Sequence, residues 1–192
     1  MEEGSILRLI LDLDGTLIRL KVDWRGVRRR LEEFLGPLPP GETVFERLSK
    51  VEGKEEVEKA LGLIEHVEKE GLRSAQLDGE VAELLKDLRR KGVVLALVSM
   101  QARDVVEEVL EKMGLREEFE VVVTRDQSLR REEQLREVLS KVGWEDVLFI
   151  GDRDEDLEAA AKIGIPAIKA RLVDGSIKHE LRRLLGSLSK PS

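Results

Sequence analysis

The sequence lacks several features that mark particular classes of protein. It contains no cysteine, which excludes disulfides and thiolate chemistry. Its longest apolar runs, such as residues 93–98, have the length of a strand and are too short to span a bilayer. The first residues, MEEGS, lack the basic and apolar regions of a signal peptide. We therefore expect a cytoplasmic protein with no membrane partner.

Side-chain amides are also scarce. The chain has no asparagine and only four glutamines, whereas charged residues make up 38% of it. Such a composition, rich in Glu, Lys and Arg, predicts a heat-adapted, thermophilic source. The net charge of −7 gives a surface that repels a phosphate backbone, so we expect no nucleic-acid partner.

Strand-like and helix-like patterns alternate from residue 78 onward, after a first apolar run at residues 6–11. Apolar runs predict later strands at 93–98, 119–123, 147–150 and 166–169, and amphipathic patterns predict helices at 80–91, 102–113, 132–142, 155–163 and 177–185. This alternation is typical of a parallel sheet with helices on both faces. The sequence thus predicts a doubly wound, Rossmann-like α/β fold.

The stretch after the first strand has a different texture. Amphipathic patterns predict helices at 24–35, 43–49 and 54–70, and no strand pattern is visible between residues 17 and 76. A cluster of glycines and prolines at 36–41 separates the first two helices. We therefore predict two units, an α/β core of residues 1–18 plus 76–192 and a small all-helical cap of residues 19–75.

Acidic side chains follow two of the predicted core strands. Asp12 and Asp14 lie at the end of the first strand and face the same way, because alternate residues of an extended segment share a side. Asp152 follows a later strand, and Asp156 lies one helical turn further on. Ligands of such sheets bind at the carboxyl ends of the strands. Four converging carboxylates would raise one another's pKa values unless a cation were bound, and oxygen ligands alone suit Mg²⁺.

Three segments at the strand ends match known motifs. Asp-Leu-Asp-Gly-Thr-Leu begins at Asp12, Ser99 follows a second strand, and Gly-Asp-x-x-x-Asp spans residues 151–156. In this order along the whole chain, the segments resemble those of the haloacid dehalogenase superfamily, on its phosphatase side. The resemblance implies that Asp12 is a nucleophile that becomes phosphorylated and that Asp14 is a general acid and base.

The resemblance also implies how a metal ion and a phosphate would be held. Mg²⁺ would be bound by the Asp12 side chain, the Asp14 backbone carbonyl and Asp152, with Asp156 supporting the metal or its waters. Ser99 would bind a phosphate oxygen. Gly15 would allow a sharp turn that brings backbone N–H groups to the phosphate.

The sequence departs from the family in one respect. Members use a cation, usually lysine, before the helix that precedes the last motif, and this chain has Arg130 and Arg131 near that place instead. Helical periodicity favours Arg131, which shares a face with Leu135 and Val138. Arginine would still neutralise phosphate charge and bind it through two nitrogens.

The sequence therefore predicts a hydrolase acting on a small phosphorylated metabolite, similar to phosphoglycolate phosphatase-like enzymes, as a monomer or homodimer. A sugar-phosphate mutase of the same superfamily would keep every motif but would protect phosphorylated Asp12 from water. A non-catalytic binding protein on the same fold is a further alternative. A dehalogenase fits less well, because family members with that activity lack the second aspartate of the motif, which is present here as Asp14. In the cap, a basic run at Arg25 and residues 28–30 is read as a solvated face in preference to a contact with an anionic substrate.

Overall fold

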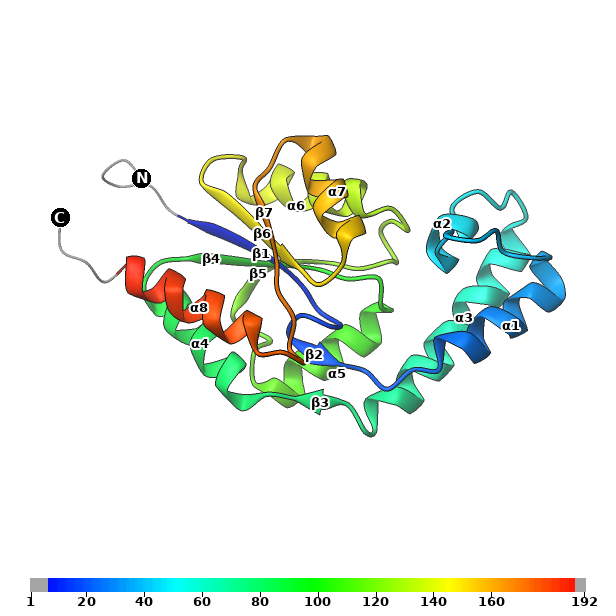
Figure 1. Ribbon diagram of the computed structural model, residues 1–192, viewed down its shortest axis with the longest axis horizontal. Helices are drawn as coiled ribbons and strands as arrows, with labels where there is room; N and C mark the ends of the chain where they lie inside the picture. Colours follow the sequence, from blue (N-terminus) through cyan, green and yellow to red (C-terminus); the bar gives the residue numbers. More distant parts are fainter. Residues whose placement is uncertain (1–6, 189–192) are drawn as a thin grey trace.

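The architecture of the computed structural model, which describes residues 7–188, is a five-stranded sheet between two layers of helices, with a helical module beside it (Figure 1). The sheet consists of β1 (Arg8–Asp12), β4 (Val94–Val98), β5 (Phe119–Val123), β6 (Val147–Gly151) and β7 (Ala167–Lys169). The order is β5-β4-β1-β6-β7, and every pairing is parallel. The predicted doubly wound α/β fold is confirmed; residue 6 of the predicted first strand lies outside the described residues.

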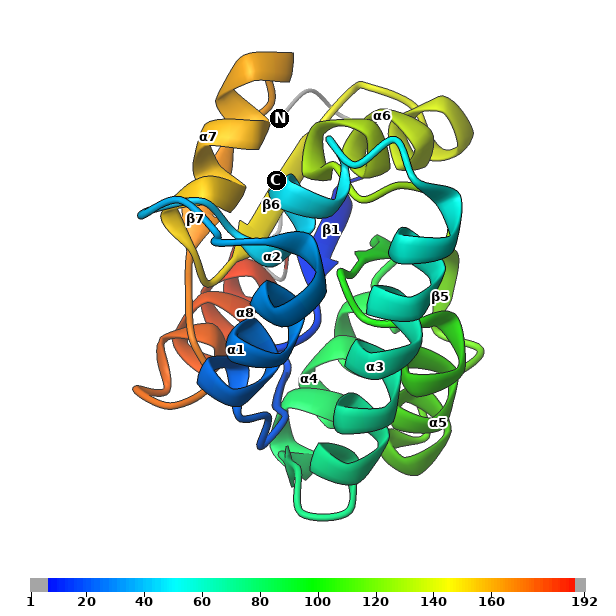
Figure 2. The same cartoon turned by 90° about the vertical axis from the view of Figure 1, so that its right-hand side faces the viewer.

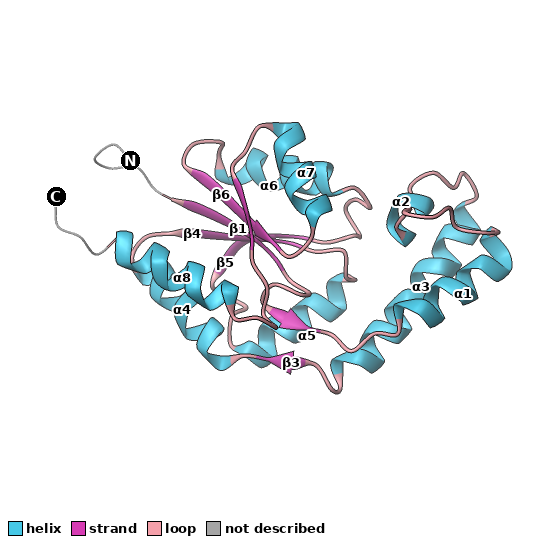
Figure 3. Ribbon diagram, in the orientation of Figure 1, coloured by secondary structure: helices cyan, strands magenta, loops and turns pink. Residues whose placement is uncertain are grey.

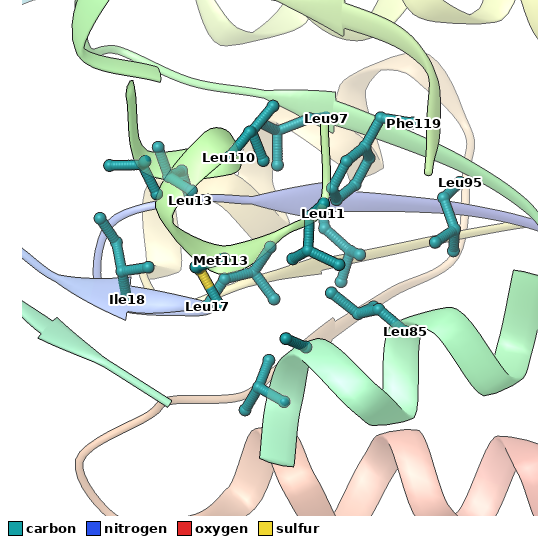
Figure 4. Close-up of a cluster of buried hydrophobic side chains, with 14 of the residues drawn as sticks. Leu11, Leu13, Leu17, Ile18, Leu85, Leu95, Leu97, Leu110, Met113 and Phe119 are labelled. Atoms are coloured by element: carbon teal, nitrogen blue, oxygen red, sulfur yellow. The ribbon is translucent and has the colours of Figure 1, made fainter. Parts of the chain in front are cut away.

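Both faces of the sheet are buried. Leu9 and Leu11 of β1 pack on one face, which is covered by α4 (Gly79–Arg90), α5 (Arg103–Met113) and α8 (Ser176–Ser187). Figure 4 shows part of this cluster, with Leu11 between the sheet and Leu85 of α4. Ile10 points to the other face, beneath α6 (Arg131–Val142) and α7 (Asp154–Ile163). Burial on both sides explains why the strands read as continuous apolar runs. Within residues 7–188, no helix has the length and apolar character needed to cross a bilayer.

The strand order reverses beside β1. The chain runs from β1 to β4 and β5 on one side and then places β6 and β7 on the other. In the register of the sheet, Asp12 pairs with Val98 and Leu11 with Ile150, so the three segments that follow β1, β4 and β6 begin at nearly the same level. This is the position at which α/β proteins bind their ligands.

The helical module lies beyond the carboxyl ends of the strands, as Figures 1 and 2 show. It consists of α1 (Trp24–Leu35), α2 (Val44–Leu48) and α3 (Lys54–Leu72), and Figure 3 shows only helices and loops in it. Its helices have a small core of their own, formed by Val27, Leu31, Leu48, Ala60 and Ile64. Side chains cap two of its helix starts, Asp23 before α1 and Thr43 before α2.

Two very short strands lie where the chain leaves and re-enters the α/β core. β2 (Ile18–Arg19) pairs antiparallel with β3 (Gln76–Leu77). The prediction that no strand occurs between residues 17 and 76 is therefore wrong. Two residues are too few to produce a periodic pattern, and the pairing joins segments that are distant in sequence.

A buried ion pair connects the helical module to the core. The Nη1 atom of Arg125, in the loop after β5, lies 2.6 and 2.7 Å from the two carboxylate oxygens of Glu68 in α3. The same nitrogen donates to the carbonyl of Met100 at 3.1 Å. Both charged side chains are almost fully buried, at 2% and 0% exposed. Burial raises the pKa of Glu68 to about 7, although the Arg125 charge acts in the opposite direction.

Candidate active site

Three carboxylates meet at the point where the strand order reverses. Asp12 is the last residue of β1, Asp152 follows β6, and Asp156 lies in the first turn of α7. One oxygen from each lies within 4.8 Å of the other two. A glycine at 151 permits this arrangement, because a Cβ there would come within 2.8 Å of the Asp156 side chain. The structure thus brings together three of the predicted site residues.

Arg131 joins this cluster from the first turn of α6. Its Nη2 lies 2.5 Å from Oδ1 of Asp12, and its Nε lies 2.8 Å from Oδ1 of Asp156. Burial alone would lower the pKa of Arg131, but the two carboxylates outweigh it and raise that pKa. Arg130 points elsewhere, since its exposed side chain lies 3.4 Å from Glu133. Of the two predicted arginines, the structure places only Arg131 among the carboxylates.

Burial and neighbouring carboxylates raise the pKa values of Asp12 and Asp152. Burial raises the pKa of Asp12 well above its usual value; Arg131 lowers it, and Asp156, Asp152 and Asp14 raise it again. The pKa of Asp152 is also raised, first by burial and then by Asp156. A bound cation would favour the ionised form of each group, and a donor set made only of carboxylates fits a hard divalent ion.

Asp14 lies beside the cluster in a different environment. Its Oδ1 accepts a hydrogen bond of 2.8 Å from the backbone N–H of Leu20. Burial raises the pKa of Asp14 to about 6; the Leu20 hydrogen bond opposes this shift and Asp152 adds to it. A carboxyl group with such a pKa can both give and take a proton near neutral pH.

A small cavity of about 60 Å³ opens onto these groups. The α/β core lines it with carboxylates and with two basic side chains, and the helical module contributes two aromatic rings; the lining residues are Asp12, Asp14, Trp24, Phe45, Met100, Gln101, Arg131, Asp152 and Arg153. The two rings meet edge to face, with centroids 6.1 Å apart. The helical module thus contributes two aromatic side chains to the lining of this cavity, and the α/β core contributes the acidic ones.

Ser99 does not line this cavity. The residue is fully buried, and its hydroxyl is hydrogen-bonded to the side chain of Gln101, which does line the cavity. Sequence reasoning missed Gln101 and Phe45 as lining residues. No motif marks them, because loop conformation and the position of the module bring them there.

Gly15 packs directly against the acidic cluster. Its φ is +94°, a conformation that favours glycine, and a Cβ at this position would lie no more than 3.0 Å from three atoms of the Asp152 carboxylate. Its N–H donates to the carbonyl of Ile18 at 2.7 Å. The structure therefore shows a close approach to Asp152 as one physical reason for this glycine.

A larger cavity of about 440 Å³ adjoins the small one. The two share Phe45, Met100, Arg131 and Arg153 in their walls. Arg130 lines only the larger cavity, as do Lys50 of the helical module and other charged residues of both units. Among the described residues, no carboxylate lies within 4.0 Å of the Arg153 guanidinium.

A doubly wound sheet with a buried carboxylate cluster at its switch point defines an α/β protein with an acidic candidate catalytic site. The chain belongs to the haloacid dehalogenase-like hydrolases, whose family model matches residues 9–170. The predicted family and the assignment as a hydrolase are confirmed.

The relatives of known name include a phosphatase and a protein kinase. The chain is 27% identical over 172 residues to a phosphoglycolate phosphatase of Synechococcus elongatus, and the match covers 83% of this chain and 81% of the relative. It is also 27% identical to the tyrosine-protein kinase PtkA of Mycobacterium tuberculosis, over 83% of this chain and 60% of that protein. Among solved structures, a predicted phosphatase from Clostridium acetobutylicum is similar with a TM-score of 0.71 at 20% identity, covering 95% of this chain and all of the other. At that identity the likeness concerns the fold.

Proposed function

We propose that this protein is a Mg²⁺-dependent phosphatase that hydrolyses a small phosphate monoester through a phosphorylated Asp12. The observation that carries the proposal is the meeting of Asp12, Asp152 and Asp156 with Arg131 at the switch point of the sheet. Membership of a hydrolase family supports the reaction type, and the phosphoglycolate phosphatase relative supports a phosphate monoester as substrate.

Asp12 and Arg131 would carry out the attack on phosphorus. The contact between the two side chains orients the Asp12 carboxylate, whose free oxygen would form the new bond as the bond to the leaving alcohol breaks. Arg131 would pair with the phosphoryl oxygens as well, since its guanidinium offers several donors in one plane. This charge offsets the repulsion between an anionic nucleophile and an anionic substrate.

Asp14 would move the protons. With one oxygen fixed by Leu20 and a pKa of about 6, it can donate a proton to the leaving oxygen. Once ionised, the same carboxylate would take a proton from the water that hydrolyses the phosphorylated Asp12. Each turnover thus returns Asp14 to its protonated form.

The carboxylates of Asp12, Asp152 and Asp156 would hold the metal ion. Their all-oxygen donor set fits Mg²⁺, and a bound cation would offset the burial and the mutual repulsion that raise the pKa values of Asp12 and Asp152. When bound, Mg²⁺ would supply charge that stabilises the phosphoryl oxygens during transfer. The proposed position of Ser99 on a phosphate oxygen would require a rotation of its hydroxyl away from Gln101.

The aromatic side chains of Trp24 and Phe45, which line the small cavity, would exclude water and limit the size of the substrate. A cavity of about 60 Å³ accommodates little more than the phosphoryl group, so the rest of the substrate would extend into the adjoining cavity. We therefore propose a small phosphorylated metabolite as substrate.

Hydrolysis of p-nitrophenyl phosphate with Mg²⁺ or with EDTA tests the proposal. We expect turnover that depends on Mg²⁺ and that Asp152→Asn lowers by a factor of at least 100. The matched control is Asp154→Asn. Asp154 lies only two residues after Asp152, but its side chain is exposed and paired with Lys169. Equal activity in both variants, or wild-type activity that EDTA leaves unchanged, would overturn the metal assignment. No turnover of any phosphate monoester would overturn the function.

A further inference from the structure

Gln134 is a fully buried polar side chain one turn after Arg131 in α6. Its Nε2 donates two hydrogen bonds of 2.9 Å, to the carbonyls of Ser99 and Ser128. Its Oε1 accepts a hydrogen bond of 2.9 Å from Nη1 of Arg131. Both ends of the amide are therefore used, and the mechanism proposed above gives this residue no role.

The contact with Gln134 completes the set of partners around the Arg131 guanidinium. Nε lies against Asp156, Nη2 against Asp12, and Nη1 against Gln134. The Arg131 side chain is only 12% exposed, so little water can replace a missing partner. Three acceptors around a planar group fix both its position and its rotation, whereas the two carboxylates alone leave the third nitrogen without a partner.

The chemical type of this side chain matters. An amide can donate two hydrogen bonds to carbonyls and accept one from a guanidinium at the same time, which neither a carboxylate nor an apolar side chain can do. It is also neutral, so it orients Arg131 without competing with Asp12 for the positive charge. Because Gln134 also holds the carbonyl of Ser99, it fixes the distance between the segment after β4 and the arginine.

We propose that Gln134 is a positioning residue for phosphoryl transfer, which acts by fixing the orientation of Arg131 toward Asp12 and the substrate phosphoryl group. This inference rests on the proposed function for the reaction that it serves. Loss of the amide would leave Arg131 charged and held by Asp12 and Asp156 alone, so that its plane is less firmly fixed. Small misplacements of a catalytic group can reduce rates by factors of about 100.

The kinetic test compares Gln134→Met in two backgrounds. With Arg131 present, we expect kcat for p-nitrophenyl phosphate to fall by about 10- to 100-fold, with a smaller change in KM. With Arg131→Lys, whose ammonium group has no plane to orient, the same replacement should change kcat less than threefold. The fall in unfolding temperature should be similar in both backgrounds. Gln127→Met is the matched control, because Gln127 is exposed and bonded within its own loop, and its kcat should stay within twofold of wild type.

Nuclear magnetic resonance of protein labelled with ¹⁵N at arginine gives a readout that needs no turnover. The Arg131 signals are identified by their loss in Arg131→Lys. We expect slow rotation of this guanidinium in wild type and fast rotation in Gln134→Met. Unchanged rotation, or equal losses of kcat in both backgrounds, would show that Gln134 only supports the fold and would overturn the inference. If wild type hydrolyses no phosphate ester, the proposed function fails, and the rotation measurement still decides whether Gln134 orients Arg131.

Discussion

Replacing Gly15 by alanine should weaken both the binding of the metal ion and the stability of the fold. At φ +94° an alanine suffers backbone strain of about 1–2 kcal/mol. Its Cβ would also overlap the Asp152 carboxylate, which must rotate away at a cost of about 0.5–1.5 kcal/mol. We therefore expect Gly15→Ala to lower the free energy of unfolding by about 1.5–3.5 kcal/mol and to move the Asp152 carboxylate away from the proposed Mg²⁺ site.

Gly92→Ala separates the two effects. Gly92 has a φ of +86°, but a Cβ there would meet no atom within 4 Å. It should therefore show the backbone strain alone, a loss of about 1–2 kcal/mol, with no effect on the site.

The assay is a titration of phosphatase activity with Mg²⁺, together with urea unfolding of each metal-free variant. Disturbing the support of a metal ligand typically weakens metal affinity by about 10- to 100-fold, and we expect a rise of that size in the half-saturating Mg²⁺ concentration for Gly15→Ala. If Gly15→Ala and Gly92→Ala required the same Mg²⁺ concentration, the proposed contact between Gly15 and a metal-binding Asp152 would be refuted.

Two further predictions follow from buried acidic groups. The folded-state pKa of Glu68 is about 7, above its ordinary value of 4.5. The stabilisation that comes from protonated Glu68 is therefore at its full value below pH 4.5 and is lost as the pH rises through 7. Arg125→Met should lower the free energy of unfolding by about 3–5 kcal/mol at pH 8, where it leaves a buried charge on Glu68, and by less at pH 5, where Glu68 is protonated. Urea unfolding measures this, and a loss that does not depend on pH would contradict it. For Asp14, with a pKa of about 6, the proton that it donates is present below that pH, so kcat/KM for an alkyl phosphate should decline above pH 6. Asp14→Asn should reduce kcat/KM for alkyl phosphates much more than for p-nitrophenyl phosphate, whose leaving group needs no proton, and equal losses would contradict the role.

The sequence predicted those features that depend on local pattern. Apolar runs marked β1, β4 and β6, because strands buried on both faces carry mostly apolar side chains, and a run interrupted by the exposed Glu120 marked the edge strand β5. Helical periodicity favoured Arg131 over Arg130, and the structure places only Arg131 among the carboxylates. A register that is regular on both sides of β1 carried the motif positions to one edge of the sheet.

Features that depend on contacts between distant segments could not be predicted. The buried pair of Glu68 and Arg125 joins two surface-like residue types from different units, and nothing near either residue in sequence indicates a partner. The same holds for Gln134, which reads as an ordinary polar helix residue until the segment after β4 is placed against it. The strands β2 and β3 are too short to give any pattern.

Chemical trapping of a phosphorylated enzyme tests the central claim most directly. Wild type and Asp14→Asn would be mixed with Mg²⁺ and p-nitrophenyl phosphate, whose leaving group needs no proton, then quenched in acid and analysed by mass spectrometry of the peptide that contains Asp12. The account predicts a phosphoryl group on Asp12 that needs Mg²⁺, accumulates in Asp14→Asn and is absent in Asp12→Asn, which should not turn over. Wild-type turnover with no phosphorylated aspartate, together with full activity in Asp12→Asn, would contradict it.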